Sequence, residues 1–408
     1  MHLSTPKLDR VSAWVINFTA DWISPLRAYL NRSSNSAAAS ALDSYIRRDL
    51  DSAADKYKEA LVWNPNDPAL LTALGQVYYE QGKIDEAETH FRKALDYDFQ
   101  HARALKALGI LLQEKNELAD AMYFYLRYLE LQPKDALVCS NLGATFHNLG
   151  DYENALDYYQ RAEKEEPKDP LIKKNRALAL LALGRAEEAR EKLKEAHELA
   201  PDDAEVNRLL GSALAATGDL HGAIEFYDHA LKKDPLDADS HFEFAGVLAR
   251  LNRFSEAARH AQTSAELFLK VRDTGRAAQA YWELGWDYCQ MGDLKSLENS
   301  VRASTEALQY DPTLAAVYFN IGLALLQLGR ESEALKRYQD GIQNLTQLVD
   351  LKYFAINDLK NALAKNPEMA GGAEILAMLE NEYNAGSKNI AETVLSLTPQ
   401  LLSEKITA

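Results

Sequence analysis

The side chains with the most evident chemistry in this sequence are cations and amides that lie between residues 103 and 208. They are Arg103, Lys106, Asn141, His147, Lys174, Asn175 and Arg208. Arginine and lysine donate charge-assisted hydrogen bonds to carboxylates. An asparagine amide both donates and accepts, so it can pair with a peptide backbone. These residue types predict noncovalent binding of a protein segment rather than bond making.

Motifs for catalysis, metal binding and cofactor binding are missing from the sequence. It contains no GxxxxGK[ST] loop, no GxGxxG turn, no HExxH helix and no CxxC pair. The nine histidines are scattered. The carboxylates are spread over expected helix surfaces, where solvated charge is the ordinary interpretation. We therefore expect no enzymatic activity, no metal ion and no cofactor.

An evenly spaced set of small residues must position the binding side chains. It includes Ala53, Ala87, Ala121, Ala155, Ala189, Ala223 and Ala257, each preceded twelve residues earlier by a glycine or alanine such as Gly75, Gly109, Gly143 and Gly211. The common interval is about 34 residues, a period typical of stacked repeat units. A ring or leucine usually follows the alanine after four residues, and a proline closes most units. Small residues at two fixed points let two helices cross closely. Each unit is therefore predicted to be two helices joined by a turn.

This frame resembles the tetratricopeptide repeat, a 34-residue helix–turn–helix unit. Two clear matches are Leu74-Gly75-x2-Tyr78…Ala87-x3-Phe91 and Leu142-Gly143-x2-Phe146…Ala155-x3-Tyr159…Pro167. The resemblance implies an all-α fold, a right-handed superhelical α-solenoid of antiparallel helix pairs. It implies about nine units, helical caps at both ends, and a concave side lined by the first helix of each pair.

The spacing of the repeat predicts the organisation of the chain. Residues 34–269 hold seven regular units, and residues 270–348 hold two more with insertions, the ninth being marked by Gly322 and Ala334. Residues 349–408 are expected to form C-terminal capping helices.

Residues 1–33 do not follow the repeat. An apolar stripe at helical spacing contains Trp14, Phe18 and Trp22. We interpret it as a cap on the first unit. As an alternative, residues 9–30 could lie on a membrane surface.

Composition narrows the classes of partner. The net charge of −16 argues against nucleic acid, which needs a cationic face. Two cysteines, Cys139 and Cys289, fit a reducing compartment. No signal-peptide pattern or apolar stretch of about 20 residues is present, so we expect a cytoplasmic location.

The family geometry would bring the cations and amides onto the concave wall of repeats 3–6. Asn141 and Asn175 hold the same place in successive units, which is similar to the asparagine ladder of O-linked N-acetylglucosamine transferase. Asn320 continues the column in the ninth unit, whereas Ala73, Ala107, Leu209 and Glu243 interrupt it. The carboxylate clamp of chaperone-binding members is matched at Lys106, Asn141 and Asn175, but Ile110 and Leu171 replace two of its residues.

We therefore expect a non-enzymatic scaffold or adaptor that binds an extended, acidic segment of a partner protein in this groove. An alternative is that the groove residues are ordinary solvated side chains. Two further alternatives are an assembly factor on a membrane surface and a structural protein that associates with itself.

Overall fold

The structure, a computed structural model, describes residues 26–29 and 36–387 of the 408-residue chain. The regular structure in these ranges is helical, and the chain divides into two compact units, Met1–Pro201 and Asp202–Ala408. The aromatic stripe of the N-terminal segment and the expected helix after residue 387 lie outside the described residues.

The helices pair in chain order. The first unit contains α2 (Ser36–Ile46), α3 (Leu50–Trp63), α4 (Pro68–Glu80), α5 (Ile84–Tyr97), α6 (Ala102–Glu114), α7 (Leu118–Leu131), α8 (Ala136–Asn148), α9 (Tyr152–Glu165), α10 (Pro170–Ala182) and α11 (Ala186–Leu199). The second contains α12 (Ala204–Ala216), α13 (Leu220–Lys233), α14 (Ala238–Arg250), α15 (Phe254–Lys270), α16 (Thr274–Met291), α17 (Leu294–Tyr310), α18 (Ala315–Gln327) and α19 (Glu331–Gln343). The part of the chain that the structure describes thus holds nine helix pairs, as the repeat predicts.

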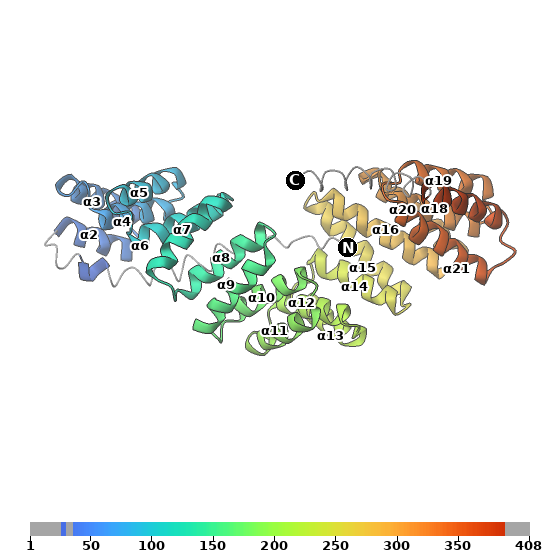
Figure 1. The fold of residues 1–408 in the computed structure, drawn as a ribbon, viewed down its shortest axis with the longest axis horizontal. Coiled ribbons are helices and arrows are strands. Elements are labelled where there is room, and N and C mark those ends of the chain that lie inside the picture. The colour runs from blue at the N-terminus through green and yellow to red at the C-terminus, as the bar shows by residue number, and fades with distance from the viewer. Residues whose placement is uncertain (1–25, 30–35, 388–408) are drawn as a thin grey trace, which may run out of the picture. The chain divides into compact units, whose positions relative to one another are not determined.

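The first helix of each pair lies on the inner side of its unit. Figure 1 shows successive helices packed as hairpins, and the first helices also contact those of neighbouring pairs: α4–α6–α8–α10 in one unit and α12–α14–α16–α18 in the other. The second helices contact chiefly the first helices that flank them. We call the faces lined by the first helices the inner walls of the two units.

A contact between a glycine and an aromatic ring sets the close approach within many pairs. A Cβ atom added to Gly75 would lie 2.7 Å from Phe91 Cε1, and the same contact recurs between Gly109 and Tyr125. It also recurs at Gly143–Tyr159, Gly211–Tyr227 and Gly322–Tyr338. In the fifth unit the inner helix carries the larger Ala177, and the outer helix carries the smaller Leu193. The first unit, in contrast, carries Ala41 and Tyr57 at these positions. At the glycine pairs the ring therefore fills the volume that a Cβ atom would need.

The turn inside each of the first seven pairs contains one residue with positive φ. These residues recur at the interval of the repeat and are Arg48, Gly82, Asn116, Gly150, Gly184, Gly218 and Asn252. A positive φ ends the first helix in the left-handed region, which glycine and asparagine tolerate best. The first helices then begin in most cases with an aspartate whose carboxylate accepts a hydrogen bond from the first-turn backbone, as Asp67, Asp169 and Asp237 do.

The last pairs depart from the regular lengths. Helices α15, α16 and α17 have 17, 18 and 17 residues, whereas α10 and α11 have 13 and 14. After α19 the chain turns and forms α20 (Leu348–Leu351), the π-helical segment η1 (Lys352–Asn357) and α21 (Asp358–Lys365) in succession. Residues 372–387 are also helical. None of the helices in the described ranges is both long enough and apolar enough to cross a membrane.

The close contact between Gly75 and Phe91 predicts that substitutions at these two positions have non-additive effects on the free energy of unfolding. Gly75→Ala should lower the free energy of unfolding by about 1–3 kcal/mol, because the new methyl group overlaps the Phe91 ring. In a Phe91→Leu background the same change should cost less than about 1 kcal/mol, as the Ala177–Leu193 pair already combines these sizes. A double-mutant cycle by urea denaturation measures the coupling, and additive effects would contradict the close contact.

The positive φ at Gly184 predicts that an alanine there lowers stability through backbone strain alone, without any side-chain clash. An added Cβ at Gly184 meets nothing within 4 Å, so Gly184→Ala should cost about 1 kcal/mol from left-handed strain alone. Gly246 of helix α14 also has nothing within 4 Å of an added Cβ. Gly246→Ala should instead stabilise by about 0.5–1 kcal/mol. Urea midpoints that move in the same direction for both variants would refute this account.

Candidate functional site

The first inner wall brings together six of the seven binding residues that the sequence predicts. Arg103 and Lys106 lie on α6, Asn141 and His147 on α8, and Lys174 and Asn175 on α10. These three helices are neighbours in contact. The seventh residue, Arg208, lies on α12 of the second unit.

Lys106 forms an ion pair within the unit. Its Nζ lies 2.8 Å from Asp135 Oδ2, and the Tyr128 hydroxyl donates to the same oxygen at 2.6 Å. The other oxygen of Asp135 accepts from the Val138 backbone N–H and so caps α8. Burial would raise the pKa of Asp135, but Lys106 and the hydrogen bonds outweigh it, so the pKa lies below its ordinary value. The charge of Lys106 is thus compensated by the next repeat.

Arg208 is compensated in the same way in the second unit. Its Nη1 donates to Glu243 Oε1 at 2.6 Å, and the Tyr227 hydroxyl donates to Glu243 Oε2 at 3.1 Å. Arg208 and Lys106 therefore hold consecutive repeats together, and neither provides an uncompensated charge for an acidic partner.

The two asparagines of the column differ from these cations. Asn141 and Asn175 are only 1% and 3% exposed, and within the described part of the chain the Oδ1 atom of each has no hydrogen-bond donor. Asn141 Nδ2 donates to the Tyr125 hydroxyl at 3.3 Å, which itself donates to Gln113 Oε1 at 2.7 Å. An enclosed acceptor without a donor costs about 1–3 kcal/mol. The wall thus presents two unsatisfied acceptors in the same register on adjacent helices.

The remaining predicted residues flank this amide pair. His147 is buried, its ring meets Tyr152 edge-on, and burial lowers its pKa, so it is neutral at pH 7. Its Nδ1 has no partner among the residues that the structure describes. Lys174 is enclosed next to Asn175. Arg103 is partly buried and forms no ion pair with another described residue, which makes it the cation best placed for a carboxylate.

Sequence reasoning missed a charged cluster behind this wall. Glu163 of α9 accepts from Lys173 of α10 at 2.9 Å, from Lys192 of α11 at 3.0 Å, and from Arg176. Despite its burial, these hydrogen bonds lower the pKa of Glu163 to about 2. The three cations lie 10 to 29 positions from Glu163 in the sequence, so no local sequence motif indicates the cluster. The cluster fixes the position of α10, which carries Asn175.

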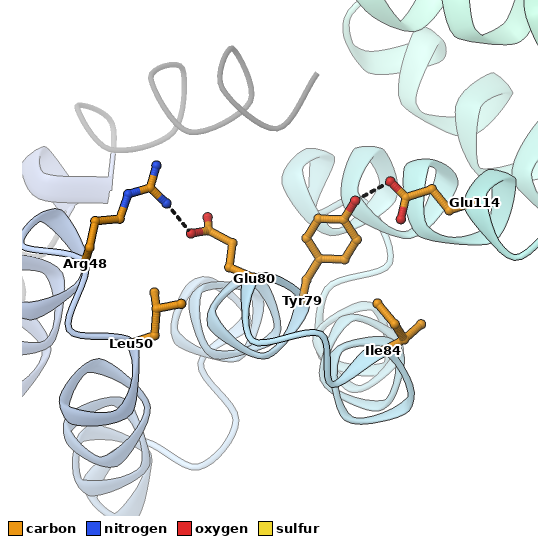
Figure 2. Close-up of a pocket in the computed structure, with 6 residues that line it drawn as sticks. All are labelled: Arg48, Leu50, Tyr79, Glu80, Ile84 and Glu114. Atoms are coloured by element: carbon orange, nitrogen blue, oxygen red, sulfur yellow. Dashed lines mark hydrogen bonds and ion pairs between the residues drawn. The ribbon is translucent and has the colours of Figure 1, made fainter. Parts of the chain in front are cut away.

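A hollow of about 340 Å³ lies elsewhere in the first unit, at the ends of α4 and α6. Figure 2 shows its polar groups paired with one another: Arg48 Nη1 contacts Glu80 Oε2 at 2.8 Å, and the Tyr79 hydroxyl donates to Glu114. Burial and Glu114 raise the pKa of Tyr79. Leu50 and Ile84 line the rest. Because its polar groups satisfy each other across successive repeats, we assign the hollow a structural role.

Metal ligands do not gather anywhere in residues 26–29 and 36–387, where no three His, Cys, Asp or Glu side chains could hold an ion together. Cys139 and Cys289 are buried free thiols. The fold and its inner walls together define a helical-repeat protein.

Comparisons with known proteins identify the family. Models described as "Tetratricopeptide repeat" match residues 24–199, 174–238 and 208–268, which together span more than half of the chain. The protein belongs to the tetratricopeptide repeat family, whose repeats form scaffolds for protein–protein interaction. A search of curated proteins found no match.

Several solved structures are similar to this chain. They include YrrB, described as a TPR protein with an unusual peptide-binding site, at 21% identity over 46% of this chain and 97% of that one, with a TM-score of 0.43. A tetratricopeptide repeat protein from Parabacteroides merdae has 19% identity over 58% of this chain and 93% of its own, with a TM-score of 0.46. Yeast Tom70 has 12% identity over 85% and 99%, with a TM-score of 0.40.

The ion pair of Lys106 predicts a pH-dependent loss of stability. Lys106→Met should lower the free energy of unfolding by about 1–3 kcal/mol at pH 7, since Asp135 keeps its charge and loses its partner. The folded state lowers the pKa of Asp135. The contribution is therefore full above the unfolded pKa of about 4 and fades as the pH falls through the folded value.

Urea denaturation of both proteins at pH 7 and pH 3 checks this, with a difference that shrinks at pH 3. Lys134→Met is the matched control, because Lys134 is exposed and adjacent to Asp135. Equal losses in the two variants would contradict the structural role of Lys106.

Proposed function

We propose that the inner wall of the first unit binds an extended segment of a partner protein, with Asn141 and Asn175 hydrogen-bonded to its backbone. The observation that carries the proposal is the pair of enclosed amide oxygens without donors. Native proteins satisfy nearly all buried polar atoms. An unsatisfied pair in one register therefore suggests that a ligand supplies the missing donors.

An extended peptide fits the spacing of the two amides. Neighbouring helices pack about 8–10 Å apart, and an extended chain rises about 3.3 Å per residue. A polyproline II segment has three residues per turn and rises about 3.1 Å per residue, so N–H groups three residues apart lie on one side of it and would reach both wall positions. A side-chain amide hydrogen-bonds to the peptide backbone and not to a particular side chain. This contact therefore selects peptides by their extended conformation and not by their sequence.

The preference for an acidic segment depends on fewer residues than the sequence suggests. Lys106 and Arg208 are compensated within the protein, and Lys174 is only 1% exposed. Arg103 of α6 is therefore the main candidate to meet a carboxylate. We infer that the partner carries an acidic residue near one end of the bound segment, and that the backbone contacts provide most of the affinity.

The amide pair predicts the outcome of peptide selection. A displayed library of twelve-residue peptides, selected on the wild-type protein, should yield binders whose Kd rises about 10- to 30-fold in Asn141→Ala/Asn175→Ala, as two hydrogen bonds are lost. The double variant should keep its free energy of unfolding within about 1 kcal/mol, because the removal of two unsatisfied acceptors offsets the lost side-chain packing and the lost Asn141–Tyr125 hydrogen bond.

Asn148→Ala is the matched control, since Asn148 is exposed at the end of α8 and its loss should leave Kd unchanged. Arg103→Gln should weaken only those selected peptides that contain aspartate or glutamate. Peptides that bind the double variant as tightly as the wild type would overturn the proposed site.

A further inference from the structure

Two carboxyl groups on the inner wall of the second unit form no ion pair with any residue that the structure describes. Glu283 and Asp287 lie one helical turn apart on α16, and Glu283 stands two residues before Gly285, in the register that Asn141 occupies before Gly143. Asp287 is only 2% exposed. Among the described residues, Glu283 Oε2 and Asp287 Oδ2 both lack a hydrogen-bond partner.

The preceding inner helix shows how this unit satisfies an acid in the same register. Glu243 of α14 receives the guanidinium of Arg208 and the hydroxyl of Tyr227. Glu283 has neither an arginine nor a tyrosine in the corresponding contacts. The next helix continues the pattern, because Asn320 of α18 is 3% exposed and its Nδ2 has no partner in the described chain. Three unsatisfied polar side chains thus occupy adjacent inner-wall positions.

Among residues 26–29 and 36–387, no cation forms an ion pair with either acid. Around α16, Asp239 of α14 pairs with Arg276, Glu243 pairs with Arg208, and His241 lies against His260. Helix α18 contains no Asp, Glu, Lys, Arg or His. Helices α15 and α17 and the segment η1, whose Phe354 meets Trp282 edge-on, carry charged residues, but none of these shifts either carboxyl. Burial, and for Glu283 also the proximity of Asp287, raises the pKa of each carboxyl to about 8.

We propose that Glu283 and Asp287 form a binding site for the ammonium or guanidinium group of a basic side chain from a partner protein. Opposite charge within about 4 Å supplies the missing partner of both carboxylates. Trp282 and Trp286, partly buried on the same helix, provide ring surface for the aliphatic stem of a lysine or arginine. The Asn320 amide, one helix further, can bind the partner's backbone as Asn141 would in the first unit.

A protein ligand explains the site better than a metal ion. Calcium and magnesium require about six oxygen ligands or more, and no group of three metal-binding side chains exists in the described ranges. The site lies in the second unit and does not depend on the amide pair of the first.

The proton content of the site provides a specific signature. With a pKa of about 8, the carboxyls are mostly protonated at pH 7 and must ionise to bind a cation. Binding at pH 7 should therefore release about one to two protons, and affinity should rise about tenfold per pH unit for each proton released below pH 8. Acids on the surface are already ionised at pH 7, so general attraction to an acidic protein releases none.

The test uses the full chain and a displayed library of twelve-residue peptides, which is selected at pH 8. Three proteins are used in parallel: the wild type, the site variant Glu283→Gln/Asp287→Asn, and the variant Glu298→Gln/Glu374→Gln. The last variant is the matched control, because it removes the same charge at two exposed acids. The wild type and the control should enrich lysine or arginine at one peptide position, and the site variant should lose this enrichment. The site variant should fold, because replacement of unpaired buried carboxyl groups by amides does not lower the free energy of unfolding.

Titration calorimetry of the best selected peptide at pH 7, in two buffers of different ionisation enthalpy, then counts the released protons. A selected pool no more basic than the starting library overturns the proposal. So does equal binding by the site variant, or binding without proton release. Asn141→Ala/Asn175→Ala should bind this peptide normally, which separates failure of this site from failure of the first-unit site.

Discussion

The contact between a glycine on the inner helix and a ring on the outer helix is the constraint on which the rest of the structure depends. It fixes how closely the two helices cross, and therefore which residues of the inner helix turn away from the partner helix. The residue two positions before this small residue holds the same place in each unit. Asn141 precedes Gly143 and Asn320 precedes Gly322, whereas Glu283 precedes Gly285, which meets Ser304 instead of a ring. Close crossing of the two helices thus aligns a column of equivalent residues along each inner wall.

The sequence predicts the helix pairs and their close contacts well, because these follow from spacing within a single repeat. It does not predict which polar residues are already satisfied. Lys106 and Asp135 are 29 positions apart, and Arg208 and Glu243 are 35 apart, so their pairing depends on how one repeat docks on the next. Glu283 and Asp287 resemble ordinary surface charges in a sequence rich in carboxylates. Their place in the register of Asn141 was the signal that could have found them.

The inner walls combine two opposite uses of polar residues. Ion pairs such as Lys106–Asp135 join successive repeats and are complete within the protein. The amides of the first unit and the acids of the second are enclosed but incomplete, at a cost to stability of about 1–3 kcal/mol for each unsatisfied group. Stability alone would favour alanine or leucine there, as at Ala107 and Leu209. The polar residues therefore lower the stability of the stack, and we propose that they do so in favour of partner binding.

The positive-φ turns bear on how such a chain can change its length during evolution. Each regular repeat carries its own left-handed turn residue, and most inner helices carry their own N-terminal aspartate, so duplication of one repeat copies every local stop and start signal. An insertion of one or two residues would instead rotate a helix and turn its wall residues away. The longer helices α15, α16 and α17 gain roughly a whole turn each. Growth by a full repeat or by about a full helical turn keeps the same faces in contact.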